Sequence, residues 1–258
     1  MMRSAVRFFK AGWMVFWWFS ASLIFWMPIS ITGLFGPRGV VAFHLCQAWV
    51  WLGSTVTGIR FSMAGNAQLD RSRSYVIVAN HQSIYDIPAL MLQLGVPFRW
   101  VIKKEVRLVP MFGWGLYAAR HIFIDRSQPK AAIQNLNNAV SALPKGISVA
   151  IFPEGSRSAD GTLKTFKKGA FLAAIHAGLP ILPVTVNGSW RTMPDKNALD
   201  FYPGPVQVHI GTPIETSAYT RDTLSDLIQA AQDAVAQHLD PDYPHPRQAP
   251  HPKPAVDG

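Results

Sequence analysis

The chain has 258 residues, of which 49% are hydrophobic and 15% are charged. This length suits one catalytic α/β domain with an appendage, and nine Trp with fifteen Phe are a heavy apolar load for a soluble protein. The single cysteine, Cys46, excludes an intramolecular disulfide and a multi-cysteine metal site. A formal charge of +9 suits an anionic membrane, nucleic acid or phosphorylated substrates, so the positions of the apolar residues must discriminate among them.

Two apolar runs open the sequence, at residues 11–35 and 40–59, with a turn sequence of Gly, Pro and Arg between them. We predict that residues 1–62 form a hydrophobic two-helix hairpin that associates with a membrane bilayer. Four tryptophans of the first run are the expected membrane-binding residues: Trp13, Trp17, Trp18 and Trp26. A membrane span needs about 20 apolar residues. Pro28 interrupts the first run and His44 makes the second less apolar, so spanning and re-entrant insertion are both open.

The basic residues before the first run predict the orientation of the hairpin. Arg3, Arg7 and Lys10 favour a cytoplasmic N-terminus, and a hairpin returns the rest of the chain to the same side. We therefore expect a membrane protein with its catalytic domain on the cytoplasmic face, at the inner membrane in a bacterium. A cleaved signal peptide is the alternative, but apolar residues continue beyond Ser22, the expected cleavage site.

Short β-rich runs alternate with helical patterns over residues 63–240, which predicts an α/β domain with a mixed sheet covered by helices. The expected strands are residues 75–79, 98–102, 122–124, 147–152, 181–186 and 206–210. The expected helices are residues 87–94, 129–143, 168–177 and 223–238. Residues 241–258 are rich in Pro and His without apolar periodicity, and we predict a disordered tail.

A histidine and an aspartate follow the first buried strand of this domain. Ligand sites in α/β sheets favour this end of a strand. On one continuous helix His81 and Asp86 would point apart, so the pair requires a loop. Asp86 can then hold one imidazole nitrogen while the other acts as a general base. The alternative is that Asp86 only caps the helix entered at Ile87, and this spacing by itself is a weak signal.

The second polar motif, Phe152 to Ser158, also follows an apolar strand. Arg157 can bind a phosphate with its planar donors, Gly155 permits close backbone approach, and Glu154 can orient Arg157 or bind a substrate hydroxyl. A polar turn with a surface ion pair is the competing interpretation. Lysines nearby add positive potential, although a solvated basic face explains each of them better individually.

A third strand end carries Asp125 and Arg126, and Arg126 is a candidate phosphate ligand. A surface pair between the two residues, or a helix cap formed by Asp125, explains the motif equally well in isolation.

These motifs, with Leu182-Pro183-Val184, resemble in residues and order the four blocks of the PlsC-like glycerolipid acyltransferases, which include 1-acylglycerol-3-phosphate acyltransferases. The resemblance covers about residues 75–186, and the apolar hairpin also fits. The family usually has Gly near the position of Arg120 or His121, and a Thr more often than Ser156.

The resemblance implies an acyl transfer from a thioester, either acyl-coenzyme A or an acyl carrier protein, to the sn-2 hydroxyl of 1-acylglycerol 3-phosphate, giving phosphatidic acid. His81 and Asp86 would be catalytic. The implied substrate-binding residues are Arg126, Glu154, Gly155, Ser156 and Arg157. Another lysophospholipid or a lyso-ornithine-type lipid is an alternative acceptor.

Two functions of other classes compete with this interpretation. A lipid or thioester hydrolase can also use His and Asp, but the sequence has no Gly-x-Ser-x-Gly elbow. A non-enzymatic protein that binds a membrane surface or nucleic acid would leave His81 and Asp86 unexplained. We expect no nucleic-acid partner, no metal site and no cofactor.

Overall fold

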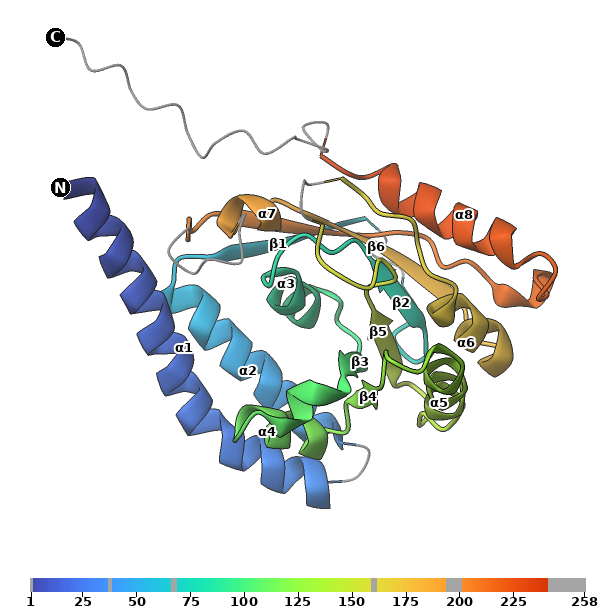
Figure 1. Cartoon of the computed structure of the whole chain (residues 1–258), viewed down its shortest axis with the longest axis horizontal. Helices are drawn as coiled ribbons and strands as arrows, with labels where there is room; N and C mark the ends of the chain where they lie inside the picture. The colour runs from blue at the N-terminus through green and yellow to red at the C-terminus, as the bar shows by residue number, and fades with distance from the viewer. Residues whose placement is uncertain (1, 37–38, 66–68, 159–161, 194–200, 241–258) are drawn as a thin grey trace, which may run out of the picture.

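The computed structural model describes residues 2–36, 39–65, 69–158, 162–193 and 201–240. The predicted tail, residues 241–258, lies outside this part of the chain. Two helices open the fold as an antiparallel hairpin: α1 (Met2–Phe35) and α2 (Val40–Val56). Figure 1 shows both packed beside the α/β domain. Helix α1 continues through Pro28, so the proline that interrupts the apolar run does not end the helix. A proline inside a helix removes one backbone N–H, and helices that pack against neighbours can tolerate this loss.

The hairpin exposes much apolar surface. Phe8–Phe35 is long and apolar enough to cross a membrane, whereas α2 is a shorter apolar helix. Phe16, Phe19 and Ile24 are each about 60% exposed, and Trp13 is 44% exposed. Trp17 and Trp26 are half-buried.

Trp18 packs inside the hairpin. Its ring lies 5.2 Å from that of Trp49, measured between centroids, and a Cβ added to Gly53 would come within 2.9 Å of it. Some aromatic residues of α1, such as Trp18, therefore pack against α2, whereas others, such as Phe16, are exposed.

A seven-stranded mixed sheet forms the centre of the molecule, in the order β1-β7-β6-β2-β5-β3-β4. Its strands are β1 (Arg60–Gly65), β2 (Val76–Ala79), β3 (Phe98–Lys103), β4 (Ile122–Ile124), β5 (Ser148–Ile151), β6 (Ile181–Asn187) and β7 (Pro205–Ile210). Among the strand pairs of the described residues, only β6–β7 is antiparallel. The carboxyl ends of β2, β5, β3 and β4 therefore meet at one edge of the sheet.

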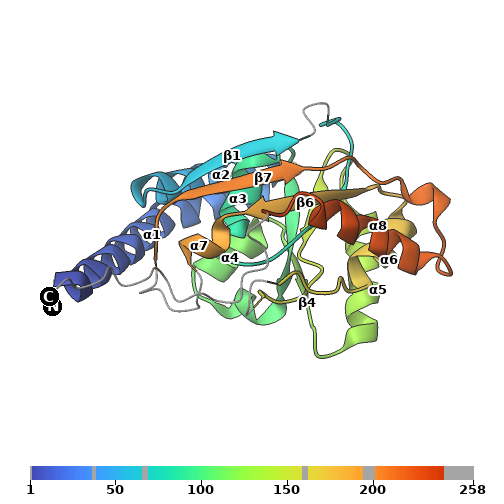
Figure 2. The ribbon, with the colours of Figure 1, turned by 90° about the horizontal axis from the view of Figure 1, so that it is seen from above.

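Each face of the sheet carries its own hydrophobic core. The faces alternate along β2: Ile77 joins the cluster that includes the hairpin and α3 (Asp86–Gln93), whereas Val76 and Val78 join the opposite cluster. The helices of the opposite face are α5 (Pro129–Ser141), α6 (Gly169–Ala177) and α8 (Leu224–Ala236). Figure 2 shows the hairpin at one end of the molecule and these three helices at the other.

The predicted mixed sheet, its six strands and its four helices are confirmed. The sequence patterns missed β1, the 3-10 helices η2 (Lys104–Leu108) and η3 (Thr216–Ala218), and the short helices α4 (Phe112–Ala118) and α7 (Ser189–Thr192). The boundary predicted after residue 62 falls inside β1, which pairs with β7 along its whole length. The chain therefore enters the sheet directly from the hairpin.

Candidate active site

The polar motifs come together because their strands are parallel neighbours. His81 follows β2, Glu154 follows β5, and Arg126 follows β4, all at the same sheet edge. Parallel strands place their carboxyl ends side by side, and this is where open α/β sheets form ligand sites. Contacts between the motifs, described below, join them into one site.

His81 and Asp86 are joined by a hydrogen bond. Residues 80–85 form a loop and α3 begins at Asp86, so the chain turns between the two side chains as expected. Nδ1 of His81 lies 2.8 Å from Oδ2 of Asp86. The His81 side chain is 16% exposed, and that of Asp86 is fully buried. With Nδ1–H donated to Asp86, the Nε2 atom carries the lone pair that can accept a proton.

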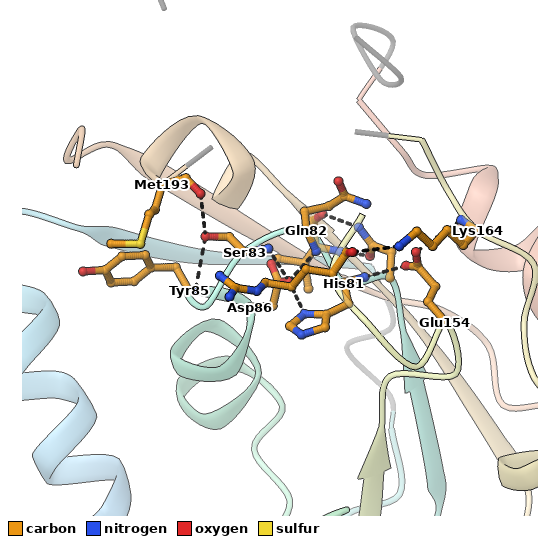
Figure 3. Close-up of polar contacts among 11 residues, drawn as sticks. His81, Gln82, Ser83, Tyr85, Asp86, Glu154, Lys164 and Met193 are labelled. Atoms are coloured by element: carbon orange, nitrogen blue, oxygen red, sulfur yellow. Dashed lines mark hydrogen bonds and ion pairs between the residues drawn. The ribbon is translucent and has the colours of Figure 1, made fainter. Parts of the chain in front are cut away.

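The carboxylate of Asp86 organises the whole loop. Its Oδ2 also accepts hydrogen bonds from the backbone N–H groups of Gln82 (2.7 Å) and Ser83 (2.9 Å). Figure 3 shows this fork of three donors around one oxygen. Its partners precede α3, so the alternative that Asp86 only caps this helix is wrong. Asn80 fixes the start of the loop, because its side chain exchanges two hydrogen bonds with the backbone of Val186.

The imidazole of His81 is also held by an aromatic stack. It lies parallel to the ring of Phe152, with 3.9 Å between centroids and 8° between planes. Trp100 stacks behind Phe152 at 5.3 Å. The hydrogen bond to Asp86 and this stack together fix both the direction and the plane of the imidazole.

Glu154 ties the β5 loop to the β2 loop. Its Oε1 accepts a 2.6 Å hydrogen bond from the backbone N–H of His81, and Oε2 accepts one of 3.2 Å from that of Lys164. In return, Ser158 donates its N–H to the carbonyl of His81 at 2.9 Å. Glu154 is 2% exposed, and burial raises the pKa of its carboxyl from 4.5 to about 7. Both oxygens of Glu154 thus accept hydrogen bonds from backbone N–H groups, so this side chain does not orient Arg157 as the sequence suggested.

The candidate phosphate ligands surround the same turn. Arg126 is exposed and donates through Nη1 to the carbonyl of Gly155 at 2.6 Å. A guanidinium has five N–H donors, so others remain for an anionic oxygen. Arg157 is half-buried on the turn, and Ser156 is exposed. Lys164 links both of them, because its ammonium donates to Ser156 Oγ at 3.2 Å and to the carbonyl of Arg157 at 2.8 Å.

Asp125 binds neither Arg126 nor the N-terminus of α5. One of its oxygens accepts from the Lys104 ammonium, and the other accepts from the hydroxyl and the N–H of Ser127. These donors lower the pKa of Asp125 to about 2. Both alternatives for this motif, the Asp–Arg pair and the helix cap, are therefore wrong.

Arg120 and His121 stand near the position where the family usually has a glycine, and both hold other parts of the fold by hydrogen bonds. Arg120 adopts φ +64°, a left-handed conformation that glycine favours. Its guanidinium donates to the carbonyls of Gly33 and Gly36 at the end of α1, each at 3.1 Å. His121 is buried, accepts the N–H of Trp100 through Nδ1, and has a pKa lowered to about 3 by burial.

Hydrogen bonds thus bring together His81, Asp86, Glu154, Gly155 and Arg126, with Ser156 and Arg157 on the same turn. Sequence reasoning missed the contacts of Phe152 with the imidazole and of Lys164 with the turn. The contact of Phe152 could have been found from the sequence. Phe152 comes directly after β5, and His81 lies just beyond the end of the neighbouring strand β2. Within the described ranges, no group of three or more His, Cys, Asp or Glu side chains is placed to hold a metal ion.

The arrangement can perform one kind of chemistry without a covalent enzyme intermediate. A buried carboxylate orients an imidazole whose second nitrogen is a general base, and cationic side chains lie on the neighbouring loop. A substrate with both a hydroxyl and an anionic group fits this combination of groups.

Comparisons with known proteins agree with this geometry. Residues 60–187 match the family model described as Acyltransferase. A curated 1-acyl-sn-glycerol-3-phosphate acyltransferase of Pseudomonas aeruginosa is 34% identical over 214 residues, covering 82% of this chain and 81% of the relative. An enzyme of the same description from Chlamydomonas reinhardtii is 33% identical over 235 residues, or 87% of this chain and 69% of the relative.

The fold also matches a solved structure. The crystal structure of PlsC, the 1-acyl-sn-glycerophosphate acyltransferase of Thermotoga maritima, superposes with a TM-score of 0.75 at 21% identity. The match covers 90% of this chain and 95% of that one.

Proposed function

Because this chain belongs to the PlsC-like glycerolipid acyltransferase family, we propose that it acylates the sn-2 hydroxyl of 1-acylglycerol 3-phosphate from a thioester, giving phosphatidic acid. The observation that carries the proposal is the 2.8 Å contact between His81 Nδ1 and the buried Asp86, one loop away from Arg126 and Arg157. The relatives named above are described as enzymes for this acceptor.

In the proposed reaction, His81 Nε2 accepts the proton of the sn-2 hydroxyl as the hydroxyl oxygen attacks the thioester carbonyl carbon. The new C–O ester bond forms, the C–S bond breaks, and the leaving thiolate takes the proton back from the imidazolium. Asp86 stabilises the imidazolium during these steps. No cofactor is required, since the thioester supplies the driving force.

The other groups of the site position the reactants. Arg126 and Arg157 bind the acceptor phosphate with charge-assisted hydrogen bonds. Gly155 and Ser156 offer backbone and hydroxyl groups on the same turn. Glu154 positions His81, because its Oε1 accepts the backbone N–H of His81 while its Oε2 accepts that of Lys164.

The apolar hairpin supports membrane association of the whole chain. With Phe8–Phe35 long enough to cross a bilayer and basic residues before it, we place the catalytic domain on the cytoplasmic face. The exposed aromatic surface of α1, including Trp13, would contact lipid. Acyl-coenzyme A and acyl carrier protein thioesters are both candidate donors in that compartment.

One assay tests the reaction and its base together. Membranes containing the protein are supplied with each donor and a panel of acceptors: 1-acylglycerol 3-phosphate, glycerol 3-phosphate, other lysophospholipids and a lyso-ornithine lipid. We expect thiol release that depends on 1-acylglycerol 3-phosphate and yields phosphatidic acid. His81→Ala should lose about 10²–10⁴-fold in rate, whereas His176→Ala, an exposed histidine on α6, should not.

Two results would contradict the proposal. Thiol release at the same rate without any acceptor would identify a thioester hydrolase. Full acyl transfer by His81→Ala would show that another group is the base.

A further inference from the structure

A second apolar surface lies outside the hairpin, on the segment that connects β3 to β4. This connecting segment comprises η2, residues 109–111 and α4. Among the described residues outside α1 and α2, seven large hydrophobic side chains are exposed, and five of them belong to it; the other two are Met63 and Ile84. The five are Leu108 (78% exposed), Trp114 (54%), Tyr117 (49%), Val109 (46%) and Phe112 (42%). Such clustering of apolar side chains marks an interaction surface.

The connecting segment is packed firmly against the hairpin. A Cβ added to Gly33 of α1 would lie 2.3 Å from the carbonyl oxygen of Ala118, so only glycine permits this approach. The rings of Phe112 and Trp49 lie 6.2 Å apart between centroids. Figure 1 shows α4 against the end of the hairpin where α1 and α2 connect. The exposed side chains of the connecting segment therefore continue the apolar surface of the hairpin.

Cationic side chains accompany these apolar residues. The guanidinium of Arg107 lies 3.8 Å over the ring of Tyr117, and Lys103 and Lys104, which precede it in the chain, are exposed. The one acidic residue of the connecting segment, Glu105, pairs with Lys103 at 3.6 Å. Aromatic rings mixed with Arg and Lys are typical of the boundary between acyl chains and anionic headgroups.

From these contacts we infer that the connecting segment is a second membrane-binding element, which inserts Leu108 and Trp114 into a bilayer surface rich in anionic lipid. The inference takes the proposed membrane association of the hairpin as its premise. Insertion of the connecting segment would affect the candidate active site, because the segment leads directly into β4 and Arg126. Lys104 also binds Asp125, the neighbour of Arg126. Insertion would thus hold the candidate phosphate-binding loop at the level of the lipid headgroups.

Site-specific labelling tests the inference without an activity assay. Cys46, the single cysteine, is replaced by alanine, and an environment-sensitive fluorophore is attached at Leu108→Cys or Trp114→Cys of the full chain. Phe16→Cys reports on the hairpin, and Ser141→Cys, exposed on α5 across the sheet, is the matched control. Each protein is reconstituted into vesicles of phosphatidylcholine mixed with phosphatidylglycerol, with and without spin-labelled lipid.

We expect blue-shifted emission and quenching by spin-labelled lipid at positions 108 and 114, and neither effect at position 141. Arg107→Glu changes the charge beside the anionic surface by two units, at about 1 kcal/mol each, so it should lower the ratio of membrane-inserted to water-exposed label by about 30-fold. Arg221→Glu, an exposed residue before α8, should cause no shift.

The inference is overturned if labels at 108 and 114 remain as exposed to water as the label at 141 while the label at 16 is quenched. Absence of quenching at position 16 as well would refute the hairpin premise too. Energy transfer between copies labelled at 108, in detergent without vesicles, would assign the surface to a second copy instead. Acyl transfer measured in parallel is independent of these readouts, so a failure of the proposed reaction would be recognised separately.

Discussion

The carboxylate of Glu154 accepts a 2.6 Å hydrogen bond from the backbone N–H of His81. Because Glu154 follows β5 and His81 follows β2, this single contact fixes one strand-end loop relative to the other. The same carboxylate accepts the N–H of Lys164, whose ammonium binds the turn that carries Arg157. One buried side chain thus sets the distance between the candidate base and the candidate phosphate ligands.

Replacing Glu154 by glutamine should lower kcat about 10- to 100-fold, with little change in KM for the thioester. Glutamine has one acceptor oxygen, so one of the two backbone N–H groups loses its partner and the His81 loop shifts. The measurement is steady-state acyl transfer above pH 7.5. Glu215→Gln, which removes an exposed ion pair with Arg73, is the matched control. Wild-type kcat in Glu154→Gln would show that the contact does not position His81.

Glu154 also predicts a pH dependence of stability. Burial raises the pKa of its carboxyl from 4.5 to about 7, so the folded chain binds this proton more tightly than the unfolded chain does. The resulting stability is fully present below the unfolded pKa and is lost as pH rises through the folded one. The free energy of unfolding should therefore fall by up to about 3 kcal/mol between pH 4.5 and pH 7, relative to Glu154→Gln. Chemical denaturation of both proteins across this range measures the difference, and a constant difference would refute the assignment.

Phe152→Leu should lower kcat about tenfold and leave KM nearly unchanged. Leucine is apolar and smaller, so it removes the parallel stack on the imidazole and lets the His81 ring leave its reactive orientation. Phe166→Leu, a buried phenylalanine on the opposite face of the sheet, controls for the general loss of packing. Equal effects of the two substitutions on kcat, at a temperature where both proteins are folded, would argue against a positioning role of the stack.

Arg126→Ala should raise KM for 1-acylglycerol 3-phosphate by about tenfold or more, since a charged hydrogen bond contributes about 1.5–3 kcal/mol. The substitution should not affect an acceptor without the phosphate, such as 1-acylglycerol. Comparing the two acceptors therefore separates phosphate binding from a change in the loop. Arg221→Ala serves as the control for the loss of a surface charge. Equal losses with both acceptors would mean that Arg126 acts only through its contact with Gly155.

Arg120→Gly should loosen the junction between the hairpin and the α/β domain. Glycine relieves the left-handed conformation, which costs about 1–2 kcal/mol, but it removes the two hydrogen bonds to Gly33 and Gly36. We expect faster amide hydrogen exchange in the last turn of α1 with little change in overall stability. Arg120→Lys, which keeps the charge without the planar donors, should give an intermediate rate. Unchanged exchange in the glycine variant would show that packing alone holds the end of α1.

Short apolar runs predicted the strands correctly because buried strands need continuous β-branched and apolar residues. The requirement for a loop between His81 and Asp86 was also predictable, since five residues on a helix would turn the side chains apart. The continuation of α1 through Pro28 was not predictable, because residue type alone does not show whether a helix tolerates a missing backbone N–H. β1 was missed because Arg60–Gly65 becomes a strand only through its pairing with β7, which is distant in sequence.

The sequence by itself determined the order of the motifs, their positions at strand ends and the apolar character of the first 60 residues. These properties are local, since each depends on residue type and spacing along the chain. Tertiary structure decided which groups meet: Phe152 on the His81 ring, Glu154 on its backbone, Lys104 on Asp125 and Arg120 on the end of α1. These contacts join residues distant in sequence, and they depend on the strand order of the sheet and on the docking of the hairpin, which residue spacing does not specify.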